Sequence, residues 1–396
     1  MRSWFIRLLI MQFTVMMPVN GMRPMVSYRA LELGASPMEL GIVVAGFSAL
    51  SFAFAVPLGR WVDRWGEPKF LVLGSFAVGF AALVMVPVAN IWLLALIYAL
   101  LGLGQVTATV GVQTLTANGG RPAQRDGRYG AISISTSASH MVGPPLAGLV
   151  FTMSGGSLDT VFLAAAGFVL LAILAGVSLW MWPPTDHARI RHPERSEGPR
   201  LGMPAAVATV FRQPTVPHAL VVSIAVVASM DLVTAYLPAY GEANGISVQA
   251  VGLLLGLRAG ATTATRVVIL PLVRRFGRRT LLFVGMVAAM LSMLMVPFTA
   301  TPTLLAVFMA IMGLGLGFGQ PLTLAWIAER MPSELRGTAV GVRVTGNRLS
   351  QLVVPIVAGA VAGATGIGAV FVVTGVLLGV GSAVVVRAPN SGKVER

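Results

Sequence analysis

Five charged side chains stand inside long apolar stretches of this chain, where a charge is rare unless it has a function. They are Arg23, Asp231, Arg258, Arg343 and Arg348. If these stretches cross a membrane, each charge costs roughly 2.5–3.5 kcal/mol to insert and should have a partner or a role. Guanidinium groups suit bidentate binding of carboxylates and phosphates. Four arginines against one aspartate therefore predict an electropositive cavity that binds an organic anion.

Other polar residues recur at helical spacing near these charges, so that they share a helix face with them. In lipid such a polar stripe has to turn toward the inside of the protein. The predicted substrate-binding set is Asn20, Arg23, His140, Asp231, Arg258, Asn347, Arg348 and Gln351. Two residues have a structural alternative. His140 could simply donate a hydrogen bond to a neighbouring carbonyl, and Arg343 could extend to the membrane surface, as we expect Arg266 to do.

The chain contains one pattern twice, at a constant offset of 211 positions. Among the matching pairs are Gly41 with Gly252, Gly66 with Gly277, Gly130 with Gly341, Pro144 with Pro355, and Gly148 with Gly359. The same offset carries Asn20 onto Asp231 and His140 onto Gln351. Polar positions therefore coincide in the two halves, which predicts that both face one central cavity. Two similar halves of apolar helices are how many membrane carriers build a site that opens to either side.

The composition excludes an ordinary soluble protein. Hydrophobic residues make up 56% of the chain, charged residues make up 11%, and the mean hydropathy is +0.83. Helices satisfy their own backbone hydrogen bonds in lipid, so we expect the apolar stretches to be membrane helices. About twelve are predicted, at 5–28, 38–59, 69–89, 91–116, 128–152, 158–182, 216–240, 247–272, 280–299, 301–326, 338–363 and 366–387.

The net charge of +14 does not indicate a nucleic-acid partner, because most of the 28 lysines and arginines lie at the termini and in alternate loops. This positive-inside pattern places both termini in the cytoplasm. The polar, proline-rich segment 183–215 divides the chain into predicted six-helix bundles at 1–182 and 216–396. The chain has no cysteine, its four histidines lack ligand spacing, and there is no ATP-binding loop. We therefore expect neither a metal nor a cofactor.

A loop signature between the second and third predicted spans suggests a family. Gly59, Asp63, Arg64 and Gly66 match the pattern G-x-x-x-D-R-x-G-R-[RK], and Glu67 departs from it. This segment resembles the loop signature of the major facilitator superfamily. The resemblance implies an all-α integral membrane fold of twelve helices in two pseudo-symmetric six-helix bundles. It covers essentially the whole chain in length, halves and topology.

The resemblance also implies a conformational latch made by this loop. Asp63 would face the N-terminus of the eleventh span near Thr338, where a helix dipole favours a carboxylate, and would hold the outward-open state. In the second half Arg274 stands at the equivalent position, so the latch would be one-sided. The alternative is that the loop charges only set the topology.

The fifth predicted span carries a second pattern. Gly130, Gly143, Pro144 and Gly148 are similar to the G-x8-G-x3-G-P-x2-G-G motif of the antiporter branches, with Ser139 at its central glycine. Small residues allow close helix packing, and proline bends a helix. Packing alone could require this pattern. The arginine typical of the fourth span in those branches is absent, and so is an acidic residue within the first six spans.

We therefore expect a monomeric secondary active transporter in the cytoplasmic membrane, which moves a small organic anion or amphiphilic acid by alternating access. Pairing of Asp231 with Arg23 or Arg258 in the empty state would couple transport to protons. The alternative is a multidrug or cation efflux antiporter with Asp231 as its acidic anchor. A membrane-embedded enzyme would want clustered His, Asp and Ser residues, and the histidines here are scattered.

Overall fold

The first half of the chain is a bundle of six helices. In the computed structural model, residues 3–118, 125–182, 203–213, 215–331 and 333–388 are described, and all regular elements among them are helices. The first six are α1 (Ser3–Glu32), α2 (Pro37–Trp65), α3 (Glu67–Val84), α4 (Ile91–Asn118), α5 (Arg125–Met153) and α6 (Leu158–Met181). The predicted all-α fold is confirmed.

The second half repeats this order with two broken spans. Its helices are α8 (Thr215–Ala243), α9 (Val248–Val267), α10 (Ile269–Phe276), α11 (Arg278–Met295), α12 (Pro302–Leu316), α13 (Gly319–Arg330), α14 (Ser333–Thr365) and α15 (Ala369–Arg387), with a short 3-10 helix at Val296–Phe298. The bend between α9 and α10 is 63°. A further helix, α7 (Met203–Arg212), lies inside the predicted linker, where the sequence pattern predicts none. Residues 183–202 of that linker lie outside the described part of the chain.

By length and composition, ten of the described helices can cross a membrane, and the bent pair of α9 and α10 adds an eleventh. The remaining predicted span is α5. Its serines, threonines and His140 lower its hydropathy. A twelve-helix arrangement is thus consistent with the structure, and the polar face of α5 explains why composition alone does not identify this helix as a span.

The backbone carries the same duplication as the sequence. Glycines with positive φ recur 211 positions apart, at Gly34 and Gly245, Gly66 and Gly277, and Gly155 and Gly366. Gly66, with φ of 87°, separates α2 from α3 in a conformation that side chains disfavour. Its equivalent, Gly277, separates α10 from α11 in the same way. The two halves therefore have corresponding turns as well as corresponding helices.

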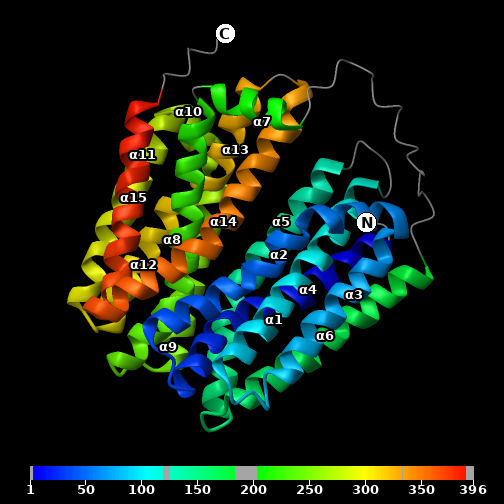
Figure 1. Cartoon of the computed structure of the whole chain (residues 1–396), viewed down its shortest axis with the longest axis vertical. Helices are drawn as coiled ribbons and strands as arrows, with labels where there is room; N and C mark the ends of the chain where they lie inside the picture. The colour runs from blue at the N-terminus through cyan, green and yellow to red at the C-terminus, as the bar shows by residue number, and fades with distance from the viewer. Residues whose placement is uncertain (1–2, 119–124, 183–202, 214, 332, 389–396) are drawn as a thin grey trace.

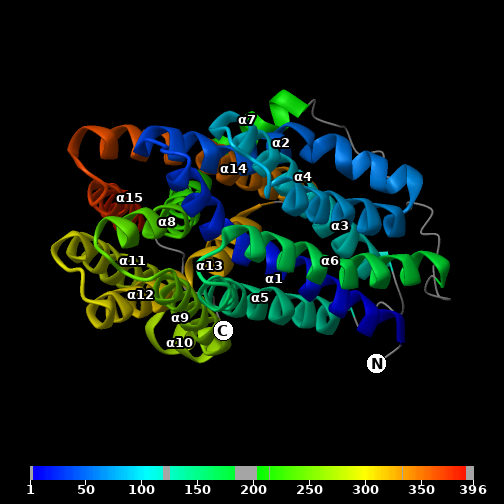
Figure 2. The ribbon, with the colours of Figure 1, turned by 90° about the horizontal axis from the view of Figure 1, so that it is seen from below.

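Two helix pairs join the halves at one end of the molecule. There, α2 packs against α14 and α5 packs against α9 (Figure 1 and Figure 2). A Cβ atom on Gly252 would lie 2.5 Å from the Pro144 carbonyl oxygen, and one on Gly41 would collide with the Pro355 carbonyl in the same manner. The 211-residue offset exchanges these two contacts, so the halves pack about a pseudo-two-fold axis.

The end formed by these contacts is called the closed end below. It contains the beginnings of α2 and α9 and the last turns of α5 and α14. Figure 1 shows the two halves diverging from it toward the opposite end, which carries α7 and the last turns of α15. Helix pairs that touch at only one end are suited to a rocking motion between the halves.

A single tyrosine hydroxyl adds to one side of the closed end. Tyr236 of α8 lies 2.8 Å from the carbonyl oxygen of Pro355 and 3.2 Å from that of Pro37, within hydrogen-bond distance of both. The equivalent residue in the first half is Met25, which has no hydroxyl. Among the described residues, the contact between α2 and α14 therefore has a hydrogen-bonding tyrosine whose equivalent is absent from the contact between α5 and α9.

Replacing Tyr236 with phenylalanine should lower the free energy of unfolding by about 1 kcal/mol, the usual net value of one hydrogen bond. Thermal unfolding of the purified protein measures this effect. Tyr28→Phe is the matched control, because the buried Tyr28 hydroxyl has no hydrogen-bond partner among the described residues. Equal losses in both variants would argue against this hydrogen bond.

Candidate functional site

A cavity of about 410 Å³ lies between the two halves. Its walls come from α1, α2, α4 and α5 of the first half and from α8, α9, α13 and α14 of the second. All members of the predicted substrate-binding set line it, namely Asn20, Arg23, His140, Asp231, Arg258, Asn347, Arg348 and Gln351. The structure thus brings these residues together at one site, and their role in binding a substrate stays a prediction.

An ion pair joins the halves across this cavity. Arg23 of α1 donates to Asp231 of α8, with a distance of 2.6 Å between Nη2 and Oδ1. The second carboxylate oxygen accepts a hydrogen bond from Nε2 of Gln351 at 2.6 Å. The two charged side chains keep only 17% and 11% of their surface exposed, so the pair is largely withdrawn from solvent. Of the two partners expected for Asp231, the described structure uses Arg23.

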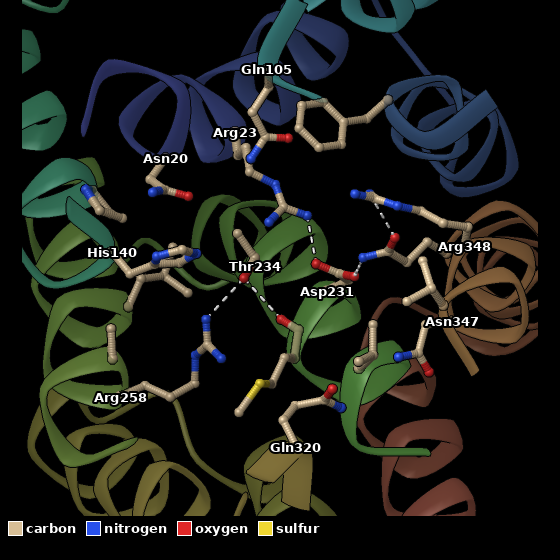
Figure 3. Close-up of a pocket in the computed structure, with 18 of the residues that line it drawn as sticks. Asn20, Arg23, Gln105, His140, Asp231, Thr234, Arg258, Gln320, Asn347 and Arg348 are labelled. Carbon is tan, nitrogen blue, oxygen red and sulfur yellow. Dashed lines mark hydrogen bonds and ion pairs between the residues drawn. The ribbon is translucent and has the colours of Figure 1, made fainter. Parts of the chain in front are cut away.

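Hydrogen bonds connect this ion pair to further residues of α14 and α2. The Gln351 side-chain oxygen accepts hydrogen bonds from Arg348 at 3.1 Å and from Ser48 at 3.4 Å. Arg348, Gln351, Asp231 and Arg23 therefore form one chain of hydrogen bonds, which Figure 3 shows running across the cavity. A change of charge at Asp231 would reach both halves through this chain.

Two residues outside the predicted substrate-binding set contact the cavity arginines. The Arg23 guanidinium lies 5.0 Å from the centre of the Phe47 ring, in a cation–π contact. Arg258 donates to the Thr234 hydroxyl at 3.0 Å. The repeat contained the signal that could have found them, because adding 211 carries Arg23 onto Thr234 and Phe47 onto Arg258.

His140 makes the structural hydrogen bond that was its alternative role. Its Nδ1 lies 2.8 Å from the Thr136 carbonyl oxygen. A carbonyl only accepts hydrogen bonds, so Nδ1 carries the proton. In the neutral ring the remaining nitrogen, Nε2, is then an acceptor. His140 also lines the cavity, so this contact does not remove it from the site.

Arg343 stays inside the protein rather than extending to a surface. It is 6% exposed and lines the cavity. It donates to the side-chain and backbone oxygens of Gln320 and to the Thr323 hydroxyl. Asn347, one turn further along α14, accepts a hydrogen bond from Ser223 at 3.0 Å. Arg266 is exposed and is not part of the cavity wall, and its extension to the membrane surface stays a prediction.

The predicted latch falls partly outside the described residues, which include neither the Asp63 side chain nor the surroundings of Gly59. The backbone does place Gly59 within α2, which continues to Trp65, so Gly66 alone makes the turn to α3. Arg64 is exposed in the last turn of α2. The latch stays a prediction.

The glycines of the fifth-span pattern differ in their surroundings. A Cβ atom on Gly143 would lie 2.6 Å from the Met17 carbonyl oxygen of α1, and one on Gly148 would lie 3.1 Å from the Val248 carbonyl of α9. Gly130 has no described atom within 4 Å of its Cβ position. Close packing is therefore concentrated near Pro144, which also lines the cavity.

These features define the class of the protein: two pseudo-symmetric helical bundles around a polar cavity are the architecture of a membrane transporter. The Major Facilitator Superfamily model matches residues 8–247 and 219–395. The chain belongs to this superfamily, as the loop signature indicated. An uncharacterized MFS-type transporter of Methanocaldococcus jannaschii is 21% identical over 358 residues, which cover 87% of each chain.

Solved structures of transporters share the fold. The nucleoside transporter NupG has a TM-score of 0.79 at 15% identity, with 98% of this chain and 99% of that chain covered. A bacterial homologue of the human lysosomal transporter Spinster, in an inward-facing and unoccupied conformation, has a TM-score of 0.77 at 14% identity, with 97% of each chain covered. At such low identity these similarities concern the fold and not the substrate.

Proposed function

We propose that this protein is a secondary active transporter of a small organic anion or amphiphilic acid, driven by a proton gradient across the cytoplasmic membrane. The observation that carries this proposal is the charge of the cavity wall. Four arginines, Arg23, Arg258, Arg343 and Arg348, and a single acidic residue, Asp231, line one cavity between the two halves. Such a wall attracts anions and repels cations.

The ion pair supplies a coupling mechanism. In the empty cavity Asp231 holds Arg23 of the opposite half. Protonation of the Asp231 carboxylate, or competition from a substrate anion for the guanidinium, would release this link between the halves. The halves could then rock, and the closed end would open. By the positive-inside rule the termini would be cytoplasmic, and the closed end would then lie at the outer face of the membrane.

A cation or multidrug exporter is less well supported by the same geometry. Such a carrier would use Asp231 to bind its substrate. Both oxygens of that carboxylate already accept hydrogen bonds, one from Arg23 and one from Gln351. A cation would have to displace a guanidinium while surrounded by three further arginines.

Transport into proteoliposomes tests the proposal. With an imposed pH gradient, the wild type should accumulate members of a panel of organic anions and exclude organic cations. Arg348→Ala should reduce anion transport by about tenfold, the usual effect of losing one charge-assisted contact. Asp231→Asn should abolish the dependence on the pH gradient, because the amide cannot take up a proton.

Arg266→Gln is the control, since it removes one positive charge outside the cavity wall. It should transport like the wild type. All variants are compared at equal amounts of protein in the membrane. Full, gradient-dependent anion transport by both Arg348→Ala and Asp231→Asn would refute the assignment, and preferential transport of cations would favour the exporter.

A further inference from the structure

The cavity has two corners that the pseudo-two-fold axis relates to each other. In one corner Asp231 and Gln351 of the second half meet Arg23 of the first. The 211-residue offset maps these second-half residues onto Asn20 and His140. The positions equivalent to Arg23 and Phe47 are Thr234 and Arg258. The arginine of the first corner therefore comes from α1, whereas the arginine of the second corner comes from α9.

Only one of these corners contains a carboxylate. Asp231 neutralises Arg23, whereas Arg258 donates to the uncharged Thr234 hydroxyl. Asn20, the equivalent of Asp231, is neutral. Figure 3 shows Asn20, His140 and Arg258 on one side of Thr234 and shows Asp231 and Arg348 on the other. Arg258 therefore forms no ion pair with a carboxylate among the described residues, although the charge of Asp231 also acts on it.

This corner also has unsatisfied hydrogen-bond donors. Asn20 is 4% exposed and Arg258 is 8% exposed. Neither Nδ2 of Asn20 nor Nε of Arg258 has a hydrogen-bond partner in the described part of the chain. Buried donors without acceptors are unfavourable, so a ligand that supplies acceptor oxygens there gains affinity. Both side chains line the cavity, which gives such a ligand access to them.

Resting on the proposed function, we propose that the carboxylate of the substrate binds in this second corner, between Arg258 and Asn20. It would accept hydrogen bonds from one guanidinium and one primary amide, the same two donor types that Arg23 and Gln351 present to Asp231. This corner therefore takes one carboxylate group of the substrate. The substrate carboxylate then supplies, next to Asn20, the negative charge that Asp231 supplies in the first corner.

The sharpest test places a carboxylate in the corner by substitution. Asn20→Asp should pair with Arg258, raise the melting temperature of the ligand-free protein by about 2 °C, and abolish binding of added carboxylates. A damaging substitution would lower the melting temperature instead. The measurement is thermal unfolding of the full-length protein in detergent, with acetate, benzoate and octanoate as probes and with benzamide and benzylamine as neutral and cationic comparisons.

Two further variants and a matched control complete the set. Arg258→Gln and Asn20→Leu should bind benzoate or octanoate about tenfold more weakly than the wild type. Arg266→Gln removes the same charge from the same helix, α9, outside the cavity wall and should bind these probes like the wild type.

The outcomes separate this inference from the proposed function. If carboxylates stabilise the wild type and bind Asn20→Asp and Arg258→Gln equally well, the second corner is not the subsite, while anion transport stands. An unchanged or lower melting temperature for ligand-free Asn20→Asp would also overturn the inference. If no carboxylate stabilises the wild type and the proteoliposomes transport no anion, both proposals fail together.

Discussion

Asp231→Ala should reduce the free energy of unfolding by about 3 kcal/mol, because it leaves the buried Arg23 guanidinium without its partner. Arg23→Met should reduce the free energy of unfolding by a smaller amount. An isolated aspartate can take up a proton and become neutral, whereas arginine cannot lose its charge.

Chemical unfolding of the four proteins in a double-mutant cycle measures the coupling between these two residues. The variant that combines Arg23→Met with Asp231→Ala should be more stable than the sum of the single losses predicts, since neither charge is left alone. Arg274→Ala, an exposed charge at the end of α10, is the control for loss of an arginine. Additive losses would show that the two side chains do not interact in solution.

The position of the cavity could be predicted from the sequence, because a polar helix face is unfavourable in lipid and has to face the inside of the protein. Asn20 and Asp231, 211 positions apart, had to occupy equivalent sites once the halves were recognised as repeats. The same reasoning could not choose between Arg23 and Arg258 as the partner of Asp231. That choice depends on the orientation of the two halves relative to each other, which the helix contacts at the closed end determine.

Other features of the site and of the fold could not be predicted from the sequence, for different reasons. Phe47 and Thr234 have side chains that are common in any membrane helix, so nothing but the repeat distinguishes them. Gly59 was assigned to the turn after α2, but the helix continues past it because a single glycine costs a helix only about 1 kcal/mol. The turn is placed by Gly66, whose positive φ ends the helix.

Two glycines determine how closely the halves approach each other at the closed end. Gly41 and Gly252 allow backbone contact between the halves at the closed end. A carrier that alternates has to make and break this contact in every cycle, so its strength should be moderate. A glycine allows close backbone contact without interdigitated side chains, so no side chains have to separate when the contact breaks.

Gly252→Ala should therefore prevent the closed end from forming. Its Cβ atom would lie 2.5 Å from the Pro144 carbonyl oxygen, which belongs to the backbone of α5 and has little freedom to move. Overpacking of this kind costs roughly 1–3 kcal/mol. Since the cost falls only on the conformation with a closed end, the ratio of closed to open protein should fall by roughly 5- to 150-fold, and transport should fall with it.

Cysteine labelling measures this shift directly, because the natural chain contains no cysteine. In Val227→Cys, which places a thiol in the cavity wall, a membrane-impermeant maleimide should react from one face of oriented vesicles only. Adding Gly252→Ala should make the thiol reactive from the other face. Gly363→Ala in α14 is the matched control, because its Cβ position has no described neighbour within 4 Å. Unchanged sidedness in Gly252→Ala would show that the glycine contact does not seal the cavity.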